Sequence, residues 1–110
     1  MYAVNEGKIK INGKMVGTFE REVQGMETAL YVTAGSTGYK GCRKREGGGR
    51  TFISIECIRG DFFFEPVVEE DGTVTGIGIA CCGDDALDAV MKALEFAHIV
   101  IDDQRCEVDD

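Results

Sequence analysis

The chain has 110 residues, of which 44% are hydrophobic and 29% are charged, a composition that excludes wholesale disorder and can form one domain with its own core. A formal net charge of −8 and a pI near 4.6 argue against a general attraction to nucleic acid or to an anionic membrane, because both would repel the chain at long range. Such a field favours a basic protein as partner. We expect a single domain over residues 1–110.

The charge is divided unevenly along the sequence. Residues 1–50 carry nine Lys or Arg and five Asp or Glu, a balance of +4, whereas residues 51–110 carry three and fifteen, a balance of −12. This asymmetry sets the electrostatic field over the surface without deciding the fold. It indicates contacts with charged partners.

The first third of the chain predicts three strands. Apolar alternation over residues 7–11 and 14–23 is interrupted by Asn12-Gly13, a pair that suits a type I′ hairpin turn because both central residues need positive φ. Residues 27–34 are rich in β-branched and aromatic side chains and predict a third strand.

Residues 35–50 predict one long loop. Its six glycines, five basic residues and one acid cannot bury a core, but a flexible basic segment can wrap a phosphate backbone while an aromatic ring stacks on a base. The glycine spacing does not fit a P-loop, and the KH clamp that it also resembles joins helices rather than strands. A solvated loop without a ligand is an equal alternative. The candidate contacts for nucleic acid or phosphate are Tyr39, Lys40, Arg43, Lys44, Arg45 and Arg50.

Three further strands follow, over residues 51–58, 62–68 and 73–81. Apolar and polar residues alternate in the first, as in a strand with one buried face. Pro66 removes a ladder donor from the second strand, which indicates an edge or a bulge near that end. One face of the third strand consists of small residues, which indicates that another element approaches it closely.

The last element is an amphipathic helix. Asp84 or Asp85 can cap its start, and Asp88 adds a favourable charge near the positive end of the helix dipole. Its apolar residues share one broad face opposite a narrow polar stripe, so we expect the helix to be largely covered. That face contains Leu87, Val90, Met91, Leu94, Ala97, His98 and Ile101. Residues 102–110 predict an acidic tail.

Together these elements predict an α+β fold. It consists of an antiparallel sheet of about five to six strands, a meander of hairpins, packed against one C-terminal helix.

The cysteines favour a reducing compartment. They are odd in number and two are adjacent, which fits a disulfide framework poorly; they are Cys42, Cys57, Cys81, Cys82 and Cys106. Residues 1–11 do not show the basic segment followed by an apolar segment that is typical of a secretory leader, and no apolar run approaches the roughly 18 residues of a spanning helix. We expect a cytoplasmic protein that does not bind membranes.

Metal and catalytic chemistry have little support. The chain has no Cys-x-x-Cys pair, and Cys57 and Cys81 fit small buried hydrophobes. Cys42, which precedes three basic residues, and Cys82, just before the helix, are candidate reactive thiols. The one imidazole, His98, lies on the apolar face, which is more typical of a core histidine than of a base. We therefore expect no catalytic residue, metal or cofactor.

The charge pattern leads to one main functional hypothesis. It is a small non-enzymatic binding module that regulates or inhibits a nucleic-acid-handling protein, for example a phage or mobile-element antagonist such as an inhibitor of a CRISPR nuclease. Its acidic surface would engage a basic cleft of a nucleic-acid-binding protein or ribonucleoprotein, while the basic loop touches nucleic acid. The candidate acidic contacts are Glu69, Glu70, Asp71, Asp84, Asp85, Asp88, Asp102 and Asp103.

Two other classes of function stay open. The first is a small cysteine-dependent enzyme that uses Cys42 or Cys82. The second is a structural homo-oligomeric subunit, a homodimer in the simplest case, that pairs through the hairpin edge at residues 8–16 or through the run Phe62-Phe63-Phe64. Acidity that serves only solubility is a further alternative.

Overall fold

A computed structural model describes residues 4–37 and 49–106 of the chain. The elements are β1 (Asn5–Ile11), β2 (Lys14–Gln24), β3 (Ala29–Ser36), β4 (Thr51–Arg59), β5 (Phe62–Val68), β6 (Val74–Cys81) and α1 (Asp84–Cys106). Every strand pair is antiparallel. The predicted α+β fold with six strands and one C-terminal helix is confirmed.

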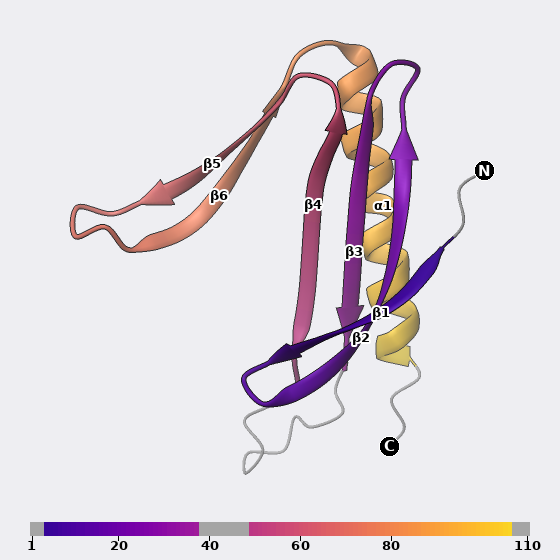
Figure 1. The fold of residues 1–110 in the computed structure, drawn as a ribbon, viewed down its shortest axis with the longest axis vertical. Helices are drawn as coiled ribbons and strands as arrows, with labels where there is room; N and C mark the ends of the chain where they lie inside the picture. Colours follow the sequence, from indigo (N-terminus) through magenta and orange to yellow (C-terminus); the bar gives the residue numbers. More distant parts are fainter. Residues whose placement is uncertain (1–3, 38–48, 107–110) are drawn as a thin grey trace.

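The strands form two sheets rather than one. β1, β2, β3 and β4 make a four-stranded sheet in that order, and β5 pairs only with β6. We call the four-stranded sheet and α1 the body, and residues 62–81 the arm. The arm projects sideways from the end of the body at which α1 begins (Figure 1). The chain turns out of the body at Gly60, whose φ of 118° suits glycine.

The β1–β2 hairpin has the predicted turn. Ile11 pairs with Lys14, so two residues connect the strands, and Asn12 and Gly13 have φ values of 47° and 84°. Positive φ at both positions is the requirement of a type I′ turn, which matches the twist of the flanking strands. The prediction from Asn12-Gly13 is confirmed.

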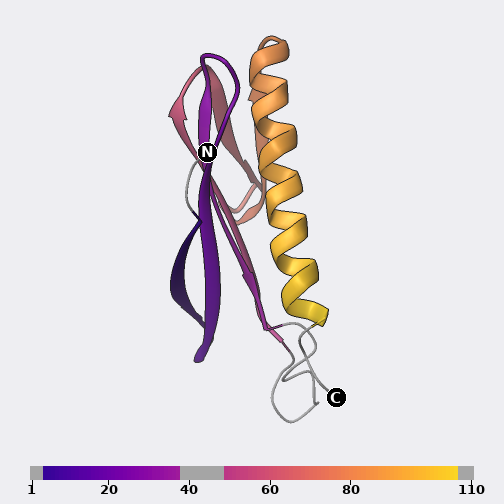
Figure 2. The same ribbon diagram turned by 90° about the vertical axis from the view of Figure 1, so that its right-hand side faces the viewer.

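The core lies between α1 and one face of the four-stranded sheet (Figure 2). Four alanines, Ala86, Ala89, Ala93 and Ala97, form the middle of the buried helix face. Their small side chains let the helix backbone approach the sheet closely. The sheet supplies Val23, Leu30, Val32 and Ala34, and the helix adds Phe96 and Val100.

The predicted helix face is only partly correct. Leu87, Met91, Leu94 and His98 are exposed, although all four were expected to be covered. Apolar residues occupy more than half of the helix circumference, and the sheet covers the alanine side of it. The large side chains therefore lie on a flank that the described residues of the chain leave in solvent.

Two boundaries differ from the sequence prediction. β3 continues through Ser36 into the predicted loop, where Gly35 is required by packing, because a Cβ there would lie 2.2 Å from the carbonyl oxygen of Gly17. At the other end α1 includes Asp102 and Asp103, which were assigned to a tail. Beyond Pro66 the β5–β6 register shifts between Val67 and Val68, and β5 is an edge strand because it pairs only with β6, so the predicted edge or bulge near Pro66 is confirmed.

Candidate functional site

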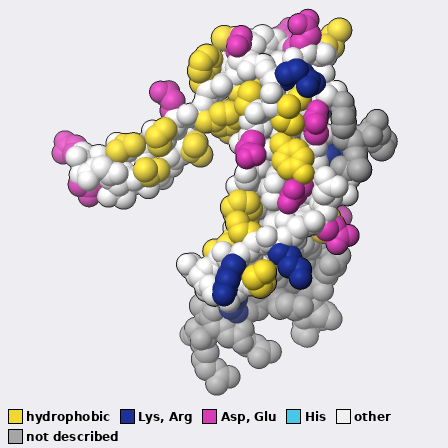
Figure 3. Space-filling view, viewed as in Figure 1, with side chains coloured by type: hydrophobic (Ala, Val, Ile, Leu, Met, Phe, Trp, Pro, Cys, Tyr) yellow, Lys and Arg dark blue, Asp and Glu magenta, His cyan; other side chains and the backbone are white. Residues whose placement is uncertain are grey.

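The predicted acidic residues lie at three separate places. Glu69, Glu70 and Asp71 form the end of the arm, where Figure 3 shows acidic side chains gathered. A second group, Asp84, Asp85 and Asp88, lies in the first turns of α1, and Asp102 and Asp103 lie near its other end. The structure does not bring these eight carboxylates together into one surface.

Asp71 orders the turn at the end of the arm. Its Oδ1 accepts a hydrogen bond of 2.9 Å from the backbone N–H of Thr73. The backbone and side-chain hydrogen bonds of Thr73 hold the pKa of the Asp71 carboxyl below its usual value. The backbone N–H of Glu69 also donates to the Thr73 carbonyl at 2.9 Å. This carboxylate shapes the arm's end while staying exposed to solvent.

Asp85 has a structural role inside the body. Its two carboxylate oxygens accept hydrogen bonds from the backbone N–H groups of Met26 and Glu27, the latter at 2.8 Å. The Glu27 and Met26 amides lower the pKa of the Asp85 carboxyl. Instead of capping its own helix, as the sequence suggested, Asp85 ties the start of α1 to the β2–β3 turn.

Arg50 is the one predicted basic contact within the described residues. Its Nε donates to the carbonyl oxygen of Ile11 at 3.2 Å, and its Nη1 donates to that of Gly49 at 3.3 Å. These bonds connect the start of β4 with the β1–β2 turn. The other predicted contacts lie outside the described residues, and they are Tyr39, Lys40, Arg43, Lys44 and Arg45.

A different acidic surface lies on the sheet face opposite α1. Strand register places Glu22 of β2 beside Tyr31 of β3, and Tyr31 beside Glu56 of β4. Directly paired residues share a face, and neighbouring strands are about 4.8 Å apart. The Tyr31 hydroxyl donates to Oε1 of Glu20 at 2.9 Å. We call Glu20, Glu22, Tyr31 and Glu56 the acidic sheet face.

Sequence reasoning missed this surface. Glu20 and Glu22 alternate along one strand, so the sequence indicates that they share a face. Tyr31 and Glu56 join them only through the register of β3 between its neighbours. Register depends on how each strand pairs with its neighbours, and the strand pattern alone does not fix it.

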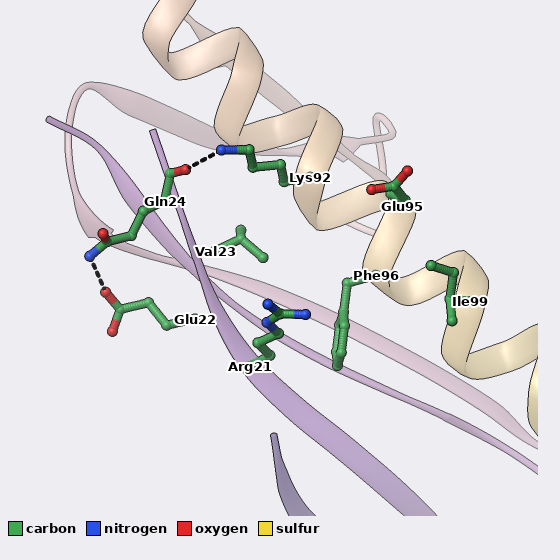
Figure 4. A pocket seen from close by; sticks show the side chains of 8 residues that line it. All are labelled: Arg21, Glu22, Val23, Gln24, Lys92, Glu95, Phe96 and Ile99. Atoms are coloured by element: carbon green, nitrogen blue, oxygen red, sulfur yellow. Dashed lines mark hydrogen bonds between the residues drawn. The ribbon is translucent and has the colours of Figure 1, made fainter. Parts of the chain in front are cut away.

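A shallow pocket of about 380 Å³ lies between β2 and α1 (Figure 4). The Arg21 guanidinium lies over the Phe96 ring, 6.0 Å from its centroid, and Nζ of Lys92 donates to the Gln24 carbonyl at 2.8 Å. Glu95 lies on the helix rim of the pocket. The two cations that line the pocket, Arg21 and Lys92, are therefore engaged in packing and in hydrogen bonding. They do not converge on one position where a ligand could bind.

The described cysteines and His98 do not form a catalytic pair. His98 lies 14 residues into α1, about 21 Å along the axis from Asp84, whereas Cys82 precedes the helix. Cys57 is exposed rather than buried as expected, and its Sγ donates to the Gly60 carbonyl at 3.5 Å. Cys81 is half-buried against the core. Cys42 lies outside the described residues.

Two further features are absent from the described part of the chain. No group of three or more His, Cys, Asp or Glu side chains there could hold a metal ion. Within residues 4–37 and 49–106, no helix is both long and apolar enough to cross a membrane.

Comparisons with protein families, with curated proteins and with solved structures found no match to this chain.

Proposed function

We propose that this protein is a non-enzymatic binding module whose acidic sheet face engages a basic surface of another protein. The observation that carries the proposal is the row of Glu22, Tyr31 and Glu56 across three paired strands, with Glu20 held beside it by the Tyr31 hydroxyl. Tyrosine is enriched at interface hot spots. Carboxylates on either side of it can pair with Lys or Arg of a partner.

The sheet favours binding because it holds these side chains at fixed spacing. Glu20, Glu22 and Tyr31 are half-buried on β2 and β3, so little side-chain freedom is lost when a partner docks. The net charge of −8 speeds encounter with a basic surface. Basic surfaces made of clustered Lys and Arg side chains are typical of proteins that bind phosphate backbones.

The proposed partner is therefore a nucleic-acid-handling protein or ribonucleoprotein that the module regulates or inhibits. A phage or mobile-element antagonist, such as an inhibitor of a CRISPR nuclease, works by this chemistry when it occupies a basic cleft in place of nucleic acid. This comparison is one of mechanism, without shared sequence or fold. The basic residues of the loop supply the second proposed contact, to the nucleic acid itself.

The test compares two variants of equal charge. E20Q/E22Q/E56Q removes three carboxylates from the acidic sheet face, and D88N/E95Q/D103N removes three exposed carboxylates from α1. Each protein is immobilised, and proteins retained from host lysate at low salt are identified. The purified partner is then titrated with each variant in the presence of labelled nucleic acid.

We expect wild type and the α1 variant to retain a nucleic-acid-binding protein and displace its nucleic acid. The sheet-face variant should bind at least about tenfold more weakly, because three charge-assisted contacts are lost. Equal retention by both variants, or retention of no nucleic-acid-binding protein at all, would contradict the proposal.

A further inference from the structure

None of the described elements covers one strip of the sheet beside α1. The helix contacts β3 most and β2 less, and it barely reaches β4. Strand register pairs Ile53 with Ala34 and Ile55 with Val32, and both partners belong to the core under the helix. Paired residues share a face, so Ile53 also faces the helix side. It is nevertheless 51% exposed.

The flank of α1 next to this strand is apolar. Lys92, whose Nζ donates to a backbone carbonyl of β2, marks the β2 side of the helix. At about 100° per residue, Leu87 and Leu94 lie on the opposite flank, towards β4, and Met91 extends this apolar surface onto the side of the helix that faces away from the sheet. Leu94 is 56% exposed and Met91 60%. We call Ile53, Leu87, Met91 and Leu94 the helix–β4 strip.

The arm carries a second apolar surface that residues 4–37 and 49–106 leave uncovered. Its register places Phe62, Phe64 and Pro66 of β5 on one face with Ile79 and Ile77 of β6. At the base of this face, Phe62 and Phe64 pack against the core, but Ile77, farther out, is 66% exposed. An isolated two-stranded hairpin is marginal in water without a covered face. The outer arm therefore needs a partner surface.

The opposite face of the arm is made accessible by glycines. A Cβ at Gly76 would have Val67 as its nearest neighbour, at 3.6 Å, and one at Gly78 would have the Glu65 carbonyl, at 3.8 Å. Both neighbours belong to the paired strand β5 and are at ordinary contact distance. Among the described residues, no other element makes the close approach that the small side chains of β6 predict.

A second copy of the chain carries the same two apolar surfaces, one on its arm and one beside its helix. The arm leaves the body at the start of α1 and points away from it (Figure 1), so it does not cover its own helix–β4 strip. A two-fold axis that turns the second body end for end lets each arm lie on the other copy's strip, in a self-complementary interface.

The apolar area matches that of a standard interface. The exposed large hydrophobic side chains of the two surfaces are Ile53, Val68, Val74, Ile77, Ile79, Leu87, Met91 and Leu94. At their exposed fractions they present roughly 800 Å² per copy, which is the area of about 800 Å² that each partner buries in a standard interface.

Charge complementarity supports the same arrangement. The end of the arm carries Glu69, Glu70 and Asp71, whereas Lys8 and Lys10 are exposed on β1. Figure 3 shows basic side chains at the lower end of the body, far from the acidic end of the arm. Turning the second copy end for end brings these opposite charges towards each other, which favours one orientation of the two copies.

We propose that the protein forms a two-fold symmetric dimer in which the arm of each copy covers the helix–β4 strip of the other. The acidic end of the arm lies against Lys8 and Lys10 of the partner copy. This assembly goes beyond the proposed function and is independent of it, because the acidic sheet face lies on the opposite side of the four-stranded sheet.

The first test measures mass in solution by light scattering and sedimentation. Wild type should have twice the 12.0 kDa of one chain. Ile77→Asp in the arm and Leu94→Asp in the strip should each weaken the dimer at least about tenfold, because a charge is placed in an apolar contact. Ile99→Asp is the matched control, since Ile99 is 51% exposed on the pocket side of α1.

The second test reverses charges. E69K/E70K alone and K8E/K10E alone should each weaken the dimer, and the four substitutions in one chain should restore it. Circular dichroism checks that every variant is folded. A wild type that is monomeric in solution would overturn the proposal. This outcome includes a monomer whose arm binds a different protein. The proposal would also be overturned by a dimer that Ile99→Asp disrupts and Leu94→Asp does not, or by a fourfold variant without rescue.

The two proposals fail separately. Leu94→Asp should still retain the basic partner through Glu22 and Glu56, whereas E20Q/E22Q/E56Q should still dimerise. A monomeric wild type that captures the partner would overturn the dimer alone. A dimer that captures no such protein would overturn the proposed function alone.

Discussion

The body and the arm are built from the same kind of strand, but they differ in what covers them. In the body, α1 lies on the sheet and buries Leu30 and Val32 completely. In the arm, strand-forming residues such as Val74 and Ile77 are paired across the hairpin yet stay largely in solvent. The comparison shows that strand propensity forms the hairpin, whereas a covering layer determines whether it is stable.

The largest expected difference between the two regions is in the cost of truncating a side chain. Leu30→Ala, in the fully buried core, should lower the free energy of unfolding by about 2–5 kcal/mol, because it removes apolar contacts and leaves a cavity. Ile77→Ala in the arm should change the stability of the isolated chain by under about 0.5 kcal/mol. Urea denaturation of the two variants under monomeric conditions measures both values. Equal losses in the free energy of unfolding would show that the core and the arm do not differ in the cost of truncating a side chain.

The alanine face of α1 provides a second comparison within one helix. Ala93→Leu should lower the free energy of unfolding by about 1–3 kcal/mol, since the enlarged side chain pushes the helix from the sheet. The control, Leu94→Ala on the exposed flank, should have an effect near zero in the monomer. Thermal and urea unfolding test this, and a tolerated Ala93→Leu would mean that the helix does not pack closely.

Asp85 should make the stability of the body depend on acid. Hydrogen bonds from Glu27 and Met26 lower the folded-state pKa of Asp85 below its ordinary value of 3.8, so the carboxylate stabilises the folded state above that pH. This stabilisation is lost as the pH falls through the lowered value. Unfolding curves between neutral and strongly acidic pH should therefore decline less steeply for Asp85→Asn than for wild type. Identical slopes for the two proteins would show that the hydrogen bonds from Met26 and Glu27 to Asp85 do not stabilise the body.

Asp71 is the carboxylate of the arm that corresponds to Asp85 in the body, and its substitution has the smallest expected effect on stability. Its pKa is also lowered, by the hydrogen bonds of Thr73, but it orders only a turn at the arm's end. Asp71→Asn should leave global unfolding unchanged within error and should speed amide hydrogen exchange only around Thr73. A change in the global unfolding midpoint would show that the arm and body unfold as one unit.

Local sequence signals predicted the elements well, and tertiary arrangement decided the rest. Asn12-Gly13 predicted its turn, because positive φ is a local property. The same signals did not predict that Gly60 directs the chain out of the sheet, or that alanines rather than Leu87 and Leu94 face the core. Both outcomes depend on which surface each element meets, and hydrophobic periodicity does not contain that information.

The candidate site was predictable to a similar extent. The acidic groups at the arm's end and on α1 follow from position in the sequence, and the structure leaves Glu69 and Glu70 exposed there. The acidic sheet face required the register of three strands. Asp85 seemed to be a surface carboxylate, but the fold uses it to hold a turn 58 residues away in sequence. Charge composition indicates a binding surface without locating it.

In the proposed dimer the body folds around its own core, whereas the arm is completed by the second copy. Amide hydrogen exchange of wild type, measured over a range of protein concentrations, tests it most directly. The account predicts that protection of β5 and β6 falls on dilution, while protection of β3 stays constant, and that Leu94→Asp shows the unprotected arm at every concentration. Arm protection that is independent of concentration and unaffected by Leu94→Asp would contradict it.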